Sequence, residues 1–491
     1  STRLYACWNR FPTIIGKENN SILGNIFPSH RSISLAILIY LGFYFFYSSF
    51  LLSLIDNIML VGESMKIKVK ESDYKSVMAR KPYKRKKPVK TSIFFRTLLK
   101  LVSKPDLKKT HFKYTEENMD LIKKDEPIFI LMNHSSFIDL EIATTIMYPR
   151  PLNIVCEADG FIGKDWLMRH IGCIPTHKFH TDVALVKDLL YCTRTLKSSI
   201  LMYPEASYSF DGTTPTPLPD SLGKCIKLLR VPVVMITTYG AFQRDPLYNL
   251  LQKRDVSVSA KVECLLTIDD IASLSVEEIN SKVREKFSFD HFKWQKENGI
   301  AISEKFRAEG LESVLYKCPH CLSEGKMVAN GETLKCTNCN KEWRLETDGS
   351  LSSDGDVYFT HIPEWFKWER EETKKEIEKG EYKMKVPVKI YLQVDSSALY
   401  SVGKGNLSQT EDGFHLLSDD GEIDYKTSPL DNYSLSSDIY WYEMGDMISI
   451  GDDRRIFYLF PPKEYKVVTK ARFATEEFYK KKKLDISKKH P

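Results

Sequence analysis

A strong net charge is missing from this sequence. Its 71 lysines and arginines stand against 65 aspartates and glutamates, which leaves +6 over 491 residues. So small an excess does not mark a nucleic-acid-binding protein, and nucleic acid is therefore the least favoured partner. An internal repeat is also absent. A single core is not expected at this length, and we predict about two to four domains.

A disulfide framework is lacking too. Six of the ten cysteines are scattered singly, which is the pattern of buried reduced thiols. These six are Cys7, Cys156, Cys173, Cys192, Cys225 and Cys264. Such cysteines favour a reducing compartment, so we expect the chain in the cytosol or on the cytosolic face of a membrane.

Charge is missing altogether from residues 33–55, a run of 23 residues. A run of this length can cross a bilayer, and the strongly basic sequence after it would keep the rest of the chain in the cytosol. Two interpretations of residues 1–64 stay open. They form a transmembrane leader that serves as a single anchor, or they are a misassigned upstream segment, because Met65 followed by Lys-Ile-Lys-Val-Lys resembles a natural start.

Residues 65–91 are predicted to form a basic arm. Seven of the eleven residues from Arg80 to Lys90 are lysine or arginine. Such a run is most often a solvated segment, and attraction to an anionic membrane surface is the functional alternative. An amphipathic helix is predicted next, at Ile93–Val102, which either packs on its own domain or lies on a membrane.

Residues 92–300 are predicted to fold as an α/β domain with a largely parallel sheet and flanking helices. Short apolar runs alternate there with longer amphipathic ones, which is typical of that class. The expected strands are Ile128–Met132, Asn153–Cys156, Ile200–Tyr203, Val231–Ile236 and Val256–Ile268. The expected helices are Ser136–Tyr148, Asp182–Leu196, Ser221–Arg230 and Ser275–Phe287.

Two smaller regions are expected after this domain. Residues 314–350 contain the four remaining cysteines, and Pro363–Gly380 is a helical stretch rich in Trp and Glu. Residues 386–483 change to short strands with Gly, Asp and Ser turns and end in a helix at Thr469–Lys482. Strands followed by one helix resemble the pleckstrin-homology (PH) or GRAM type of β domain, on pattern alone.

Residues 133–139 carry the first chemical motif, Asn-His-Ser-Ser-Phe-Ile-Asp. It lies where an expected strand ends and an expected helix begins, the usual position of a site in an α/β domain. With His134 before the helix and Asp139 in its first turn, the carboxylate can reach the imidazole and fix its tautomer. An alternative stays open for Asp139, which with Ser136 forms a capping-box pattern that needs no catalytic role.

Three further segments follow in order. Residues 172–178 read Gly-Cys-Ile-Pro-Thr-His-Lys, residues 203–208 read Tyr-Pro-Glu-Ala-Ser-Tyr, and residues 231–234 read Val-Pro-Val-Val. In this order the four segments resemble the four blocks of the glycerophospholipid acyltransferase family, of the 1-acylglycerol-3-phosphate type. The first block is matched in full, and the resemblance covers roughly residues 92–290.

The resemblance implies roles for individual residues. His134 would be the general base on an acceptor hydroxyl, which attacks the thioester of acyl-CoA or acyl carrier protein, and Asp139 would orient it. The implied acceptor contacts are Asn133, Ser136, Lys178, Glu205 and Ser207. The reaction needs neither a metal nor an acyl-enzyme, because a thioester is already activated.

One position departs from the family pattern. The third block usually ends in arginine, and here it ends in Tyr208. A phenol cannot replace a bidentate guanidinium on a phosphate, so of the expected cations Lys178 alone remains. Two acceptor classes therefore stay open: a glycerophosphate lipid, and a different lipid that bears a hydroxyl or an amine.

The second site is a pair of Cys-x-x-Cys knuckles separated by 14 residues. Its thiols are Cys318, Cys321, Cys336 and Cys339. This spacing predicts a tetrahedral four-thiolate Zn²⁺ site in a small zinc ribbon, and Trp343 suits the core of such a module. Four thiolates leave no open coordination position, so the predicted role of the zinc is structural.

Two functions from different classes are therefore predicted. The first is a membrane-associated lipid acyltransferase on the cytosolic face, with a membrane lipid as acceptor and acyl-CoA or acyl carrier protein as co-substrate. The second is a zinc-ribbon adaptor whose acyltransferase-like domain binds lipid without turnover. Mutation of His134 separates the two.

Overall fold

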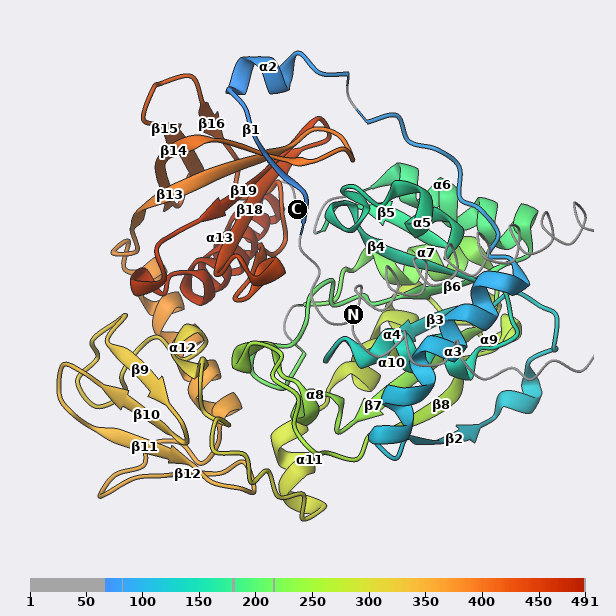
Figure 1. Ribbon diagram of the computed structural model, residues 1–491, viewed down its shortest axis with the longest axis horizontal. Coiled ribbons are helices and arrows are strands. Elements are labelled where there is room, and N and C mark those ends of the chain that lie inside the picture. The colour runs from blue at the N-terminus through green and yellow to red at the C-terminus, as the bar shows by residue number, and fades with distance from the viewer. Residues whose placement is uncertain (1–66, 82, 179–181, 215–216, 490–491) are drawn as a thin grey trace, which may run out of the picture. The chain divides into compact units, whose positions relative to one another are not determined.

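The computed structural model describes residues 67–81, 83–178, 182–214 and 217–489 (Figure 1). These described residues all belong to one compact unit. The charge-free run, and with it both interpretations of residues 1–64, lies outside the described residues. Within the described ranges, no helix has both the length and the apolar character that crossing a membrane requires.

A seven-stranded sheet forms the centre of the α/β region. Its strands stand in the order β2-β8-β7-β3-β6-β4-β5. They are β2 (Lys113–Glu117), β3 (Phe129–Met132), β4 (Leu152–Glu157), β5 (Cys173–Thr176), β6 (Ser199–Met202), β7 (Val233–Tyr239) and β8 (Ser259–Leu266). Five of the six neighbouring pairs are parallel, and the β7–β8 pair is antiparallel. The α/β class is confirmed, and the sheet is largely parallel as expected, although the antiparallel β7–β8 pair makes it a mixed one.

The burial of each strand agrees with its position in the sheet. β3 lies at the centre of the sheet, and all four of its residues are buried and apolar, as a strand covered on both faces requires. β2 lies at the edge and is exposed at every residue. Its sequence, Lys-Tyr-Thr-Glu-Glu, therefore carries no apolar pattern that could predict a strand.

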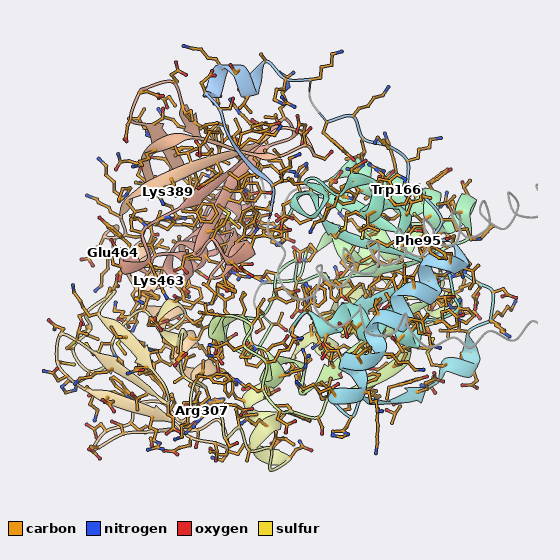
Figure 2. All side chains as sticks on the ribbon, viewed as in Figure 1. Phe95, Trp166, Arg307, Lys389, Lys463 and Glu464 are labelled. Carbon is orange, nitrogen blue, oxygen red and sulfur yellow. The ribbon has the colours of Figure 1, made fainter. Side chains whose placement is uncertain are left out.

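Helices pack around this sheet (Figure 1). They are α3 (Ile93–Lys109), α4 (Ile138–Ile146), α5 (Asp165–His170), α6 (Val183–Tyr191), α7 (Ser221–Leu229), α8 (Ala241–Arg244), α9 (Ile268–Ser273), α10 (Val276–Phe287) and α11 (His291–Glu297). α3 packs on the domain through Phe95 and Leu98, and the Phe95 and Trp166 ring centroids are 6.1 Å apart (Figure 2). Ile93 and Leu101 of the same helix stay exposed.

Gly172 occupies the tight turn before β5. Its φ is +97°, and a Cβ there would stand 2.4 Å from the Leu152 carbonyl oxygen and 2.4 Å from Thr91 Oγ1. We expect Gly172→Ala to lower the free energy of unfolding by at least about 2 kcal/mol, because both the left-handed backbone and the clash must be relieved. Denaturant unfolding measures this loss. Gly299→Ala is the control, since Gly299 has a positive φ but no atom within 4 Å of the added Cβ. Equal losses in the two variants would contradict the role of the clash.

A small antiparallel sheet follows, in the order β12-β11-β10-β9. Its strands are β9 (Met327–Asn330), β10 (Thr333–Cys336), β11 (Glu342–Leu345) and β12 (Leu351–Ser352). The buried Trp343 lies in its core, with its ring centroid 4.8 Å from that of Trp365. Trp365 belongs to α12 (Ile362–Glu378), so the small sheet and this helix share one core.

The C-terminal region is an antiparallel sheet followed by one helix. The strand order is β16-β15-β14-β13-β19-β18-β17. The strands are β13 (Met384–Gln393), β14 (Leu399–Thr410), β15 (Gly413–Ser418), β16 (Asp424–Lys426), β17 (Ser436–Asp438), β18 (Met447–Asp452) and β19 (Arg455–Phe460). The helix, α13 (Val468–Lys489), buries Phe473 and Phe478 in the core that it shares with α12. The predicted β-rich region is confirmed, while its likeness to PH or GRAM domains stays a prediction.

The basic arm is joined to this C-terminal sheet. β1 (Val69–Glu71) pairs in parallel with β14, with Val69 opposite Leu399, and α2 (Tyr74–Met78) follows. Several cations of the basic run form ion pairs within the protein. They are Arg80 with Asp395, Arg85 with Asp182 and Asp188, and Lys86 with Asp165. Part of the charge of the run is therefore neutralised by the protein itself.

Candidate active site

The first motif lies between β3 and α4. β3 ends at Met132 and α4 begins at Ile138, so His134 precedes the helix and Asp139 stands in its first turn. His134 Nδ1 is 3.4 Å from Asp139 Oδ2. The structure thus brings the carboxylate to the imidazole at the carboxyl end of a central parallel strand, where α/β proteins usually place their sites.

The Asp139 carboxylate is buried and held by fixed donors. Its Oδ2 accepts the N–H of Ser135 at 2.6 Å and of Ser136 at 3.0 Å, and its Oδ1 accepts the Thr238 hydroxyl at 3.3 Å. Only one of the two hydrogen bonds of the capping box is present, the one from the Ser136 N–H to the Asp139 carboxylate. The Asp139 N–H donates to the Ser136 carbonyl oxygen, at 3.2 Å, and not to the Ser136 hydroxyl. A carboxylate held in this way can orient the imidazole without moving.

Two aromatic rings contact the His134 imidazole. The ring centroids of Tyr203 and Tyr208 each lie 4.1 Å from that of His134, whose side chain keeps 21% exposure. Burial lowers the pKa of His134 against the opposing effect of Asp139, and Lys178 lowers it further. The imidazole is therefore neutral at pH 7. The Asp139 contact assigns its proton to Nδ1 and leaves Nε2 free of a proton.

Glu205 ties the third motif to the first. Its Oε2 accepts the His134 N–H at 2.6 Å, and the Ser209 N–H donates to the His134 carbonyl oxygen at 3.0 Å. Burial raises the pKa of Glu205 to about 8, so this carboxyl is protonated at neutral pH. The structure thus shows Glu205 positioning the His134 backbone, and its contact with an acceptor stays a prediction.

Two other expected acceptor contacts have partners within the protein. Ser207 Oγ accepts a hydrogen bond from Arg472 Nη2 at 2.9 Å. Lys178 Nζ forms an ion pair with Glu157 at 2.5 Å. Burial alone would lower the pKa of Lys178, but the carboxylates of Glu157 and Asp159 raise it. The cation expected on an acceptor phosphate is thus already paired with a carboxylate.

Asn133 and Ser136 lie at the same edge of the sheet. Asn133 Oδ1 accepts the Thr238 N–H at 2.8 Å and its hydroxyl at 3.2 Å, and Asn133 Nδ2 donates to Ser135 Oγ at 3.0 Å. Ser136 is fully buried. Asn133 therefore joins the end of β3 to the end of β7, which keeps the first motif in place.

Three residues of this site were missed by sequence reasoning: Thr238, His291 and Arg472. His291 Nε2 lies 3.1 Å from Ser135 Oγ. Thr238 could have been found, because it lies two residues after the expected strand Val231–Ile236 and the carboxyl ends of parallel strands meet at one edge of a sheet. His291 and Arg472 carry no local signal, since the residues they contact are 156 and 265 positions away.

The four cysteines of the knuckles come together beside the small sheet. Their Sγ atoms all lie within 4.8 Å of one another. The Cys318–Cys339 and Cys321–Cys336 sulfur pairs are each 3.7 Å apart. A tetrahedron with Zn–S bonds of about 2.3 Å has its sulfur atoms about 3.8 Å apart. The four thiols therefore fit a tetrahedral metal ion.

Comparisons with known proteins bear on the first site. Residues 113–238 match the family model named Acyltransferase. Among solved structures, the chain is similar to the crystal structure of the 1-acyl-sn-glycerophosphate (LPA) acyltransferase PlsC from Thermotoga maritima, with 19% identity, a TM-score of 0.30, and coverage of 39% of this chain and 76% of that chain. No curated protein matches the sequence.

The matched segment contains all four motifs. It runs from the first residue of β2 almost to the end of β7, and it includes His134, Asp139 and Glu205. The predicted resemblance is therefore confirmed at the level of the family. We conclude that residues 113–238 of this chain form a domain of the acyltransferase family.

Proposed function

We propose that this protein transfers an acyl group from acyl-CoA or acyl carrier protein to a hydroxyl of a lysophospholipid-type acceptor. The observation that carries the proposal is the His134–Asp139 pair, with 3.4 Å between Nδ1 and Oδ2, inside the acyltransferase-family domain. A neutral imidazole backed by a buried carboxylate has the chemistry of a general base for a hydroxyl. The 1-acylglycerol-3-phosphate type of acceptor is part of this proposal.

In the proposed reaction, His134 Nε2 takes the proton of the acceptor hydroxyl while the hydroxyl oxygen attacks the thioester carbonyl carbon. A C–O bond forms and the C–S bond breaks, and the proton passes from His134 to the departing thiolate. Asp139 stabilises the imidazolium that exists between these two proton transfers. Each atom and charge is accounted for without an acyl-enzyme.

The test is an acyl-transfer assay with lipid mass spectrometry as the readout. The full chain is incubated with acyl-CoA or acyl carrier protein and with a panel of lysophospholipids and a membrane lipid extract. New acylated lipid that is absent with His134→Ala would support the proposal and identify the acceptor. If no acceptor is acylated while wild type and variant bind lipid equally, the chain is the non-catalytic lipid-binding adaptor.

The rate of acyl transfer is expected to have a bell-shaped dependence on pH. The acid limb lies below about pH 6.5. The pKa of His134 is lowered, so its imidazole becomes protonated, and can no longer accept a proton, only at more acidic pH. The basic limb follows Glu205, with a pKa of about 8, whose ionisation places a negative charge next to the backbone of the proposed base, His134.

Glu205→Gln is expected to remove the basic limb and keep the acid limb, because an amide oxygen still accepts the His134 N–H. Profiles of kcat/KM from about pH 5 to 9.5 measure both limbs. A basic limb that is unchanged in Glu205→Gln would contradict the assignment to this carboxyl.

The accessory regions are included in the proposal. We propose that Cys318, Cys321, Cys336 and Cys339 bind a structural Zn²⁺ as a zinc ribbon, which the sulfur separations support. The antiparallel strands that precede α13 support a PH- or GRAM-like fold for the C-terminal region. The exposed Ile93 and Leu101 on the basic helix α3 support attachment to a membrane surface.

A further inference from the structure

His291, the first residue of α11, contacts the first motif from outside the matched segment. The residue is buried, and its Nε2 lies 3.1 Å from Ser135 Oγ. Ser135 lies in the turn between β3 and α4, and its backbone N–H donates to Asp139 Oδ2 at 2.6 Å. His291 is therefore two hydrogen bonds away from the carboxylate of the proposed catalytic pair.

The groups around Ser135 fix the direction of its hydrogen bond to His291. The Thr238 N–H donates to Asn133 Oδ1, which orients that amide, so Asn133 Nδ2 donates to Ser135 Oγ at 3.0 Å. The Ser135 hydroxyl is buried, and His291 Nε2 is the acceptor that it contacts. The reverse direction would leave the hydroxyl hydrogen buried without an acceptor, which is costly. Ser135 therefore donates to His291, and the imidazole proton is assigned to Nδ1.

The surroundings of the His291 ring keep it neutral and in place. The ring stacks on that of Phe242, with centroids 5.4 Å apart, and meets the Phe289 ring edge-on at 4.8 Å. Burial lowers the pKa of His291 to about 3, against the opposing effect of Asp290. Nδ1 has no hydrogen-bond partner among the described residues. The ring is thus a fixed acceptor for Ser135 at any pH near neutrality.

The backbone of His291 is anchored independently of its ring. The His291 N–H donates to the Gly212 carbonyl oxygen at 2.9 Å, and the His291 carbonyl oxygen accepts the Gln243 side-chain amide. The neighbouring Asp290 caps the N-terminus of α11. Loss of the imidazole should therefore leave α11 in place, so that its effect arises at Ser135.

We infer that His291 is a positioning residue for the His134–Asp139 pair. Its Nε2 holds the Ser135 hydroxyl, and the Ser135 N–H holds Asp139 Oδ2. Because the hydroxyl is held, the turn keeps this N–H aimed at the carboxylate, which then stays 3.4 Å from His134 Nδ1. The inference rests on the proposed function and adds to it a residue from beyond the segment that the family model matches.

His291→Phe tests the inference in the full chain, because phenylalanine keeps the ring packing and removes the acceptor. It is expected to lower kcat for acyl transfer roughly 10- to 100-fold with little change in KM, as for a lost supporting hydrogen bond. His291→Gln is expected to keep most of the rate, because its amide oxygen can accept the Ser135 hydroxyl. Ser135→Ala should lower kcat as much as His291→Phe, and the double variant should lower it no further.

The pKa of His134 gives a second readout that needs no turnover. Asp139 raises this pKa, so a carboxylate that is held less firmly should leave it lower. His134 keeps 21% side-chain exposure, and diethyl pyrocarbonate modifies neutral imidazoles. The rate of its modification, followed by peptide mass spectrometry from about pH 5 to 8, reports the pKa. His291→Phe is expected to lower the pKa of His134, and His291→Gln to leave it unchanged.

His361→Phe is the matched control. His361 Nε2 contacts Asp290, next to His291, at 3.0 Å, but among the described residues its side chain makes no hydrogen bond to residues 133–139. This variant is expected to keep the wild-type kcat and the wild-type pKa of His134. Equal changes in His361→Phe would mean that a loosened α11 is the cause and would overturn the inference.

The remaining outcomes separate this inference from the proposed function. Unchanged kcat and unchanged His134 pKa in folded His291→Phe would overturn the inference while the proposed function stands. A lowered His134 pKa in His291→Phe, together with no acyl transfer by the wild type to any acceptor, would support the positioning role and refute the proposed function. Thermal melts establish that each variant is folded.

Discussion

Replacing His134 by alanine is expected to lower kcat/KM for acyl transfer by at least about 1000-fold, within the range of a lost general base. No neighbouring carboxyl can substitute for it. Asp139 is held by the N–H groups of Ser135 and Ser136, and Glu205, with a pKa of about 8, is protonated at neutral pH. The loss should fall on kcat with little change in KM, because the base acts in the transition state.

Asp139→Asn and His134→Gln complete this experiment. Asp139→Asn keeps an oxygen for the backbone donors but loses the charge that raises the pKa of His134, so the acid limb should move to lower pH while the rate falls. His134→Gln keeps a planar polar side chain between the two tyrosine rings and should be as inactive as His134→Ala. A correctly folded His134→Ala protein with more than about a tenth of the wild-type rate would contradict the assignment of the base.

Removal of the zinc proposed for the four-cysteine site is expected to unfold the small β sheet. Zinc in a structural site contributes about 10–16 kcal/mol in small domains, and the net stability of most domains is about 5–15 kcal/mol. Cys336→Ser, or a chelator on the wild type, should therefore lower the thermal transition and make residues 316–361 sensitive to proteases. Plasma mass spectrometry of zinc, a thermal melt and limited proteolysis measure the three effects.

The matched control for this prediction is Cys225→Ser, which replaces a partly buried cysteine on α7, outside the four-cysteine group. It should keep the zinc and the protease resistance. A metal-free protein that melts and is cleaved like the zinc-loaded one would contradict a structural role for the ion.

The loss of the proposed zinc is also expected to affect the C-terminal helix α13. The Trp343 and Trp365 ring centroids are 4.8 Å apart, and the Phe366 ring of α12 lies 4.7 Å from the Phe473 ring of α13. Phe473 directly follows Arg472. Unfolding of the small sheet should therefore loosen α12 against α13.

The central strands could be predicted from the sequence because burial on both faces makes them continuous apolar runs. β3 and β7 are such strands. β5 (Cys173–Thr176) has four residues, one of them Pro175, and so short a segment with a proline resembles a loop. Edge and short strands owe their pairing to the neighbouring strand, and that information is not local.

The contacts of the candidate site likewise fall into those that could be predicted from the sequence and those that could not. His134 and Asp139 are five positions apart, and their contact could be expected from a strand that leads into a helix. The contacts of Thr238 with Asn133 and of Arg472 with Ser207 span 105 and 265 positions. They exist because the sheet aligns its strand ends and because α13 docks on the domain. Neither event has a signature in a short window of sequence.

The pairing of β1 with β14 affects how the chain assembles during synthesis. Val69 pairs with Leu399, so 330 further residues must be translated after β1 before its partner exists. At ordinary rates of translation this takes roughly half a minute. During that time β1 exposes unpaired N–H and C=O groups, which invite contacts with other nascent chains. Lys68 and Lys70, in and beside this strand, are the kind of charged residues that limit such contacts until the sheet is complete.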